Sequence, residues 1–154
     1  MGRIFGRFQR ARRDEFGQSM VELALLLPIL VFGLIGAADL ARAFAIQLAI
    51  ENGARAGAEA YAINFAPTPA LASARAYDEI SRTPGIDINN PLLVVDTPLK
   101  AVHTDGSLCT TTPTVLDPCW YTVTVTYEFH TLVPWPFIPN TANFNRSTTI
   151  RTFY

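Results

Sequence analysis

The sequence predicts an α+β protein, in which a long amino-terminal helix continues into a small domain with a short second helix and an antiparallel β-sheet. Three observations support this class. Residues 23–38 form an uncharged apolar run, residues 39–62 keep a helical period, and residues 121–129 alternate apolar and polar side chains. We therefore expect one element that can cross a membrane and one packed domain outside it.

The apolar run has the length of a membrane-spanning helix. Met20 to Ala38 gives 19 residues, and about 20 residues cross the hydrocarbon core of a bilayer. A single carboxylate, Glu22, stands at the start of this run. An ionisable group costs on the order of 2.5–3.5 kcal/mol at the centre of a membrane helix and less near its ends. Glu22 is therefore a candidate functional residue that needs a partner.

Charge predicts the orientation of the span. Residues 1–17 carry a net charge of +3 and residues 18–154 carry −4, because five arginines precede the run. A basic flank marks the cytoplasmic side of a membrane helix, so we expect a single-pass protein with its amino terminus inside and its carboxyl terminus outside. A patch of the kind that binds nucleic acid is not predicted.

Three interpretations of the amino terminus compete. A secretory signal peptide would need an apolar region of about 7–15 residues before a small-residue cleavage site. Candidate sites lie at residues 36–38 and 41–43, but the run is longer and the helical pattern continues past both. A plain signal anchor leaves Glu22 without a role. A prepilin-type leader would be cleaved on the cytoplasmic side after a glycine, here Gly17.

The residues that follow Gly17 closely resemble those of a known family. The stretch from Gly17 to Pro28, then Asp39 and the Asn-Gly-Ala-Arg-Ala-Gly-Ala segment at residues 52–58, resembles the TadE-like minor pseudopilins of tight-adherence (Flp, type IVc) pilus systems. The resemblance covers roughly residues 16–62. It implies a pilin-like fold and a role in pilus assembly, initiation or tip formation, and so in surface adhesion.

The resemblance also implies processing and partners. A membrane prepilin peptidase would cleave between Gly17 and Gln18 and leave Glu22 as the fifth residue of the mature protein. Other partners would be pilin or pseudopilin subunits, the pilus assembly platform and the lipid bilayer. The protein would lie in the bacterial cytoplasmic (inner) membrane and then in the pilus or at the cell surface.

Two roles for Glu22 stay open. The new amine at Gln18 would have a pKa near 8, and the Glu22 carboxylate of a neighbouring subunit could pair with it and set the register of packed helices. Alternatively, Ser19 could be an N-cap whose capping box includes Glu22. A mature amino-terminal Gln18 could also cyclise and lose its charge.

The expected division of the chain has three parts: residues 1–17 as a basic leader, 18–62 as the long helix with its span at about 20–38, and 63–154 as the extracytoplasmic domain. Pro28 should kink or loosen the helix. Beyond the span, Leu40, Phe44 and Leu48 recur every four residues, and a polar row that we expect to be solvated comprises Gln47, Glu51, Arg55 and Glu59. The Ala- and Gly-rich end at residues 54–62 suits close packing of the domain.

Within the domain we expect one helix and several strands. Pro67 and Pro69 should end the long helix, and the second helix should run from Ala70 to about Arg82, with Leu71, Ala74, Tyr77 and Ile80 or Ser81 on one face. Residues 121–129 give the clearest strand. Further candidate strands are residues 92–95, 101–103 and 147–153.

Cys109 and Cys119 predict a disulfide, because a cysteine pair outside the cytoplasm is ordinarily oxidised. A redox site is not favoured, because the cysteines lack the C-x-x-C spacing. A metal site is not favoured either, because no further ligands are near the pair, and His103 and His130 stand alone. We expect no metal, no cofactor and no enzyme activity, since no catalytic motif is present.

One apolar segment, residues 132–139, contains three prolines and is kept out of regular structure. It could be a contact loop for another subunit or a surface, or it could fold back to cover the core. The alternative to a pilus subunit is a single-pass membrane protein that presents a small extracytoplasmic binding domain outside any filament.

Overall fold

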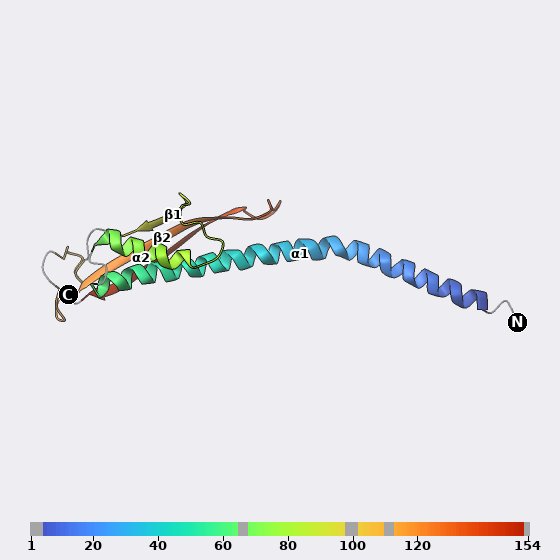
Figure 1. The fold of residues 1–154 in the computed structure, drawn as a ribbon, viewed down its shortest axis with the longest axis horizontal. Coiled ribbons are helices and arrows are strands. Elements are labelled where there is room, and N and C mark those ends of the chain that lie inside the picture. The colour runs from blue at the N-terminus through green and yellow to red at the C-terminus, as the bar shows by residue number, and fades with distance from the viewer. Residues whose placement is uncertain (1–4, 65–67, 98–101, 110–112, 153–154) are drawn as a thin grey trace. The chain divides into compact units, whose positions relative to one another are not determined.

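The computed structural model describes residues 5–64, 68–97, 102–109 and 113–152, with side chains from Gly17 onward (Figure 1). Five elements follow in chain order: α1 (Phe5–Ala62), α2 (Pro69–Ser81), β1 (Leu93–Asp96), β2 (Cys119–His130) and β3 (Thr141–Thr152). The predicted class, pilin-like α+β, is confirmed. The chain forms two compact units, residues 1–40 and 41–154, and α1 contributes to both.

The first unit consists of the amino-terminal part of α1. The helix begins at Phe5 and passes through Ser19 without a break, so Ser19 is no N-cap in the uncleaved chain, and a capping box at the mature amino terminus stays a prediction. It also runs on through Pro28, where a kink stays a prediction. The large apolar side chains from Met20 to Leu34 are 44–72% exposed. This surface suits lipid or another protein, and α1 is long and apolar enough to cross a membrane.

The second unit contains a three-stranded antiparallel sheet in the order β1-β2-β3. The central strand β2 pairs with β1 through Val95↔Val125 and with β3 through Tyr121↔Ile150. Tyr121, Val123, Val125 and Phe129 are buried and the side chains between them are half-exposed, as the alternation predicted. One face of the sheet therefore builds the core.

Two strand predictions need correction. β3 begins at Thr141, well before the expected residue 147, because residues 141–145 pair with the end of β2; strand formation there depends on the partner more than on local propensity. In the expected strand 101–103, Val102 makes only isolated bridges with Leu108 and Trp120. Ala101 and Phe153 lie outside the described residues.

The core lies between the sheet and both helices. Its fully buried members come from both helices and from the central strand: Ile50, Ala54 and Ala58 of α1, Ala72 and Ile80 of α2, and Tyr121, Val123 and Val125 of β2. Most α1 residues in this set are small. The predicted role of the Ala- and Gly-rich end of α1 in close packing is thus confirmed.

The second helix corrects two details of the sequence interpretation. Pro69 is the first residue of α2 and Thr68 is its N-cap, with the Leu71 N–H donating to Thr68 Oγ1 at 3.3 Å; proline suits this position because its missing N–H would have no helical partner. The buried face consists of Ala72, Ala76 and Ile80, whereas Leu71 is 52% exposed. The expected face was correct for Ile80 and wrong for Leu71 and Ala74, which are exposed, because α2 packs on α1 mainly through the small residues Ala72 and Ala76.

Glycines of α1 explain why small residues are needed. A Cβ on Gly57 would lie 2.9 Å from the Ala72 carbonyl oxygen and 3.2 Å from Ala76 Cβ. One on Gly53 would lie 2.5 Å from Ile80 Cγ1. The two helices therefore approach each other nearly backbone to backbone, and larger residues on this face of α2 would push them apart.

Candidate functional site

The candidate processing residues lie on one exposed side of α1. A Cβ on Gly17 would meet nothing within 4 Å, and Gln18 and Glu22 are exposed. Gln18 Nε2 lies 3.4 Å from Glu22 Oε1, one helical turn away, and can donate a weak hydrogen bond to it. In the uncleaved chain, Glu22 thus has a polar neighbour within its own helix.

This arrangement has a clear chemical consequence. Hydrolysis of the bond between residues 17 and 18 would create an amine on the residue that already faces Glu22. That amine would be mostly cationic at neutral pH, and it would stand one turn from a carboxylate. The same pair of groups can also meet between neighbouring helices, because both lie on exposed surface.

Beyond residue 38, α1 presents two contrasting exposed rows. Leu40, Phe44 and Leu48 are 73%, 70% and 50% exposed. On the polar row, Arg55 Nε lies 2.6 Å from Glu59 Oε1, and this hydrogen bond and the carboxylate charge raise the pKa of Arg55. The polar row is solvated as expected, whereas the apolar row is not covered by the domain.

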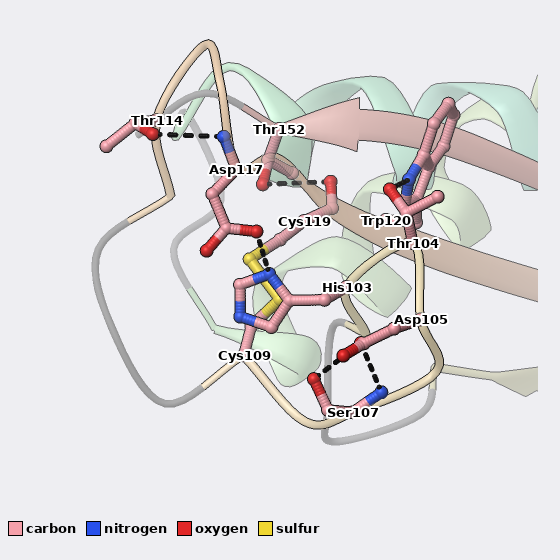
Figure 2. The surroundings of a disulfide bond; sticks show 10 residues. All are labelled: His103, Thr104, Asp105, Ser107, Cys109, Thr114, Asp117, Cys119, Trp120 and Thr152. Atoms are coloured by element: carbon pink, nitrogen blue, oxygen red, sulfur yellow. Dashed lines mark hydrogen bonds and ion pairs between the residues drawn. A yellow bond between two sulfur atoms is a disulfide. The ribbon is translucent and has the colours of Figure 1, made fainter.

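The predicted disulfide is present between Cys109 and Cys119, with a Cα–Cα distance of 6.1 Å (Figure 2). It joins the start of β2 to the loop that precedes it. Thr152 Oγ1 of β3 donates to the Cys119 carbonyl at 3.3 Å, so the bridge is attached to the sheet. It closes the end of the second unit where β2 starts and β3 ends.

His103 lies beside this disulfide, so the interpretation that it stands apart is wrong. Its Nδ1 atom is 2.8 Å from Asp117 Oδ1, and the imidazole is next to the sulfur atoms (Figure 2). The adjacent turn is held by Asp105, which accepts hydrogen bonds from the Ser107 hydroxyl and N–H at 2.6 and 2.9 Å. These two bonds lower the pKa of Asp105.

The ligand atoms of His103, Cys109 and Cys119 lie within 4.8 Å of one another. Such a group could in principle hold a metal ion. The cysteine ligand of metals is the thiolate, however, and both sulfurs are engaged in the disulfide. In this oxidised form the cluster offers one imidazole and no thiolate.

The sequence interpretation overlooked residues that position α1 against the sheet. Arg42 Cζ lies 5.5 Å from the centre of the Phe129 ring, the Tyr61 and Tyr121 rings stack at 3.7 Å, and Arg146 Nε lies 3.8 Å from Glu51 Oε2. These contacts join residues separated by 60 or more positions. Nothing in local periodicity could have paired them.

Comparison with known proteins identifies one region of the chain. The family model described as TadE-like protein matches residues 17–59. This match begins at the candidate cleavage glycine and includes the apolar run and the glycines that pack on α2. Neither the curated proteins nor the solved structures gave a match.

The matched family and the fold agree. TadE-like proteins are a structural rather than an enzymatic family, and a pilin-like fold with one long apolar helix is consistent with a protein of Tad pilus systems. The apolar helix also indicates a membrane or secreted location. Residues 17–59 of this chain are thus similar to the TadE-like protein family.

Proposed function

We propose that this chain is the precursor of a minor pseudopilin of a tight-adherence, type IVc pilus. A prepilin peptidase cleaves it after Gly17, and the mature subunit acts in pilus assembly, initiation or tip formation and so in surface adhesion. The observation that carries this proposal is the TadE-like match that begins at Gly17 and lies within one continuous helix.

The charge distribution supports the topology that this function requires. The five arginines before the span favour a cytoplasmic amino terminus, which places Gly17 on the cytoplasmic side of the inner membrane. The disulfide supports an oxidising location for the second unit. The precursor is then a single-pass protein with its domain outside.

Exposed apolar surface on α1 supports assembly with other subunits. Phe44 and Leu48 keep 70% and 50% of their surface exposed although they belong to the packed unit. Burial against neighbouring helices would stabilise such side chains by roughly 1.5–3 kcal/mol each. Pilin or pseudopilin helices and the assembly platform are the partners that this row fits.

The cleavage step can be tested by amino-terminal sequencing of the membrane-extracted protein and by Gly17→Ala. The added methyl group has free space, so a failure of processing would reflect recognition by the peptidase and not misfolding. Wild type should begin at Gln18, and Gly17→Ala should keep its leader and leave cells without pili.

Gly33→Ala is the matched control, because a Cβ at residue 33 also meets nothing within 4 Å. It should be processed as wild type is. An intact leader on the wild-type protein, or normal processing of Gly17→Ala, would refute the peptidase assignment. It would favour the single-pass protein outside any filament.

The role of Glu22 can be tested separately. Glu22→Ala should leave cleavage intact and abolish or strongly reduce pili, because register pairing with a neighbouring amine is lost. Glu59→Ala removes another exposed carboxylate from the same helix, one that pairs with Arg55 of that helix, and should preserve both. A gel shift reports cleavage, and electron microscopy reports the number of pili. Normal piliation of Glu22→Ala would exclude the register role.

A further inference from the structure

The loop between β2 and β3, residues 131–140, presents apolar side chains to the outside. Phe137 is 95% exposed, Ile138 62% and Leu132 60%. These side chains do not cover the core, so that interpretation of the segment is wrong for them. No charged residue occurs from Thr131 to Asn145. The tip of the hairpin is therefore apolar, exposed and uncharged.

The loop nevertheless has a defined internal structure. Asn140 Oδ1 accepts a hydrogen bond from the Trp135 N–H at 2.6 Å, and the Thr131 N–H donates to the Asn140 carbonyl at 3.0 Å. Thr131 Oγ1 donates to the Val133 carbonyl at 2.9 Å. Pro134, Pro136 and Pro139 have no N–H to satisfy. The loop thus bonds several of its own polar groups, while the side chains of Leu132, Phe137 and Ile138 stay exposed.

Contacts within the second unit show where the hairpin tip lies along α1. Tyr121 at the start of β2 stacks on Tyr61, and Phe129 near its end lies against Arg42. The strand therefore runs opposite to α1, and its tip reaches the first turn of α1 in this unit. Arg42 follows Ala38, the end of the apolar run, by four residues, or about 6 Å along a helix.

The geometry points to a membrane-surface anchor. We infer that Trp135, Phe137 and Ile138 enter the headgroup boundary of the leaflet from which α1 emerges, and hold the domain of the unassembled subunit against the bilayer. Aromatic rings favour this boundary, and the hydrogen bonds within the loop reduce the polar backbone surface that it would bring there. The inference rests on the proposed membrane-inserted precursor, and lipid is the occupant because Phe129, at the base of the loop, lies against Arg42, which follows the end of the apolar run by four residues.

The test uses the full chain in vesicles with Trp120→Phe, which leaves Trp135 as the sole tryptophan. Vesicles of phosphatidylcholine and phosphatidylglycerol carry bromine either high or low on the acyl chains. Trp135 emission should fall by about half or more with shallow bromine and less with deep bromine, as expected for an interfacial ring.

Two further variants make the result specific. Adding Phe137→Ser and Ile138→Ser should abolish the quenching. Leu116→Ser is the matched control, because Leu116 is 97% exposed in the loop just before β2, at the opposite end of the strand; it should leave the quenching unchanged.

Extraction with alkaline carbonate separates this inference from the proposed function. If the chain resists extraction but Trp135 is quenched by aqueous iodide and not by bromolipid, the anchor is refuted and the membrane-spanning precursor stands. Protection from both quenchers would also refute it, because the loop would then contact a second copy of the chain. If alkaline carbonate extracts the chain, the proposed membrane-spanning helix is refuted, and the proposed anchor is refuted with it.

Discussion

The two ends of α1 use opposite kinds of side chain for opposite purposes. Residues 20–34 present large apolar side chains and leave 44–72% of their surface exposed, whereas the packed end buries Ile50, Ala54 and Ala58 completely. Large residues are thus mostly outside and small ones inside. In an ordinary core the large residues supply the buried area. Here the first half presents surface for lipid or neighbouring subunits, and the second half lets other backbones approach.

The same contrast appears at the glycines. A Cβ on Gly17 or Gly33 would meet nothing within 4 Å, while one on Gly53 or Gly57 would collide with α2. Glycine in a helix costs about 1 kcal/mol relative to alanine. At residue 57, close packing against α2 explains why a glycine is present despite that cost. At residue 17, recognition by a peptidase is our proposed explanation.

The largest expected difference between the halves comes from removing one apolar side chain from each. Ile50→Ala should destabilise the second unit by about 2–5 kcal/mol, since it creates a cavity in a fully buried site. Leu25→Ala, at a residue that is 69% exposed, should leave its melting unchanged. Near-ultraviolet circular dichroism in detergent measures the second unit alone, because every Tyr and Trp follows residue 60. Equal shifts would show that the halves fold as one unit.

Loss of the disulfide should have the next largest effect. Replacing Cys109 and Cys119 by Ala releases a short closed loop, for which the chain-entropy estimate is about 2–3 kcal/mol. The melting temperature of the second unit should fall, while the helical signal of the first half should persist in detergent. Both can be followed by circular dichroism in one temperature scan. A simultaneous loss of both signals would contradict independent stability of the apolar half.

Gly57→Ala should destabilise by less. Overpacking against the Ala72 carbonyl costs about 1–3 kcal/mol, and the gain in helix propensity, about 1 kcal/mol, opposes it. Gly33→Ala gains the same helix propensity without a steric clash. Gly33→Ala should therefore raise the free energy of unfolding, whereas Gly57→Ala should lower it. Urea titration of both variants would measure this. A stabilised Gly57→Ala would show that α2 shifts away at little cost.

The features predictable from sequence are those with a local cause. The apolar run and the alternation of Tyr121, Val123 and Val125 can each be recognised within a single helix or strand. On α2, burial of Ile80 was predicted, but burial of Ala72 in place of the more hydrophobic Leu71 was not, because it depends on the close approach of Gly57 on α1.

The same limit applies to the candidate sites. Gly17 and Glu22 were proposed because both belong to one short motif, and the disulfide was predicted because a cysteine pair outside the cytoplasm is ordinarily oxidised. The position of His103 beside Cys119 depends on bridges of Val102 with Leu108 and Trp120, and the place of the β2–β3 loop depends on Arg42 meeting Phe129. Such pairings follow from tertiary packing and have no signature in either segment alone.

The smallest predicted effect concerns pH and again involves only the packed half. Burial raises the pKa of the Tyr121 hydroxyl above its usual value of 10.0, although the Thr97 hydroxyl and charges nearby modify the shift. Because folding favours the neutral form, this contribution to stability is complete below the unfolded pKa and is lost as pH rises through the folded pKa. Melting temperatures measured from about pH 8 to about pH 11 should therefore decline above about pH 10. Tyr121→Phe has no proton to lose and should decline less steeply. Parallel curves for the two proteins would mean that Tyr121 does not cause the alkaline loss.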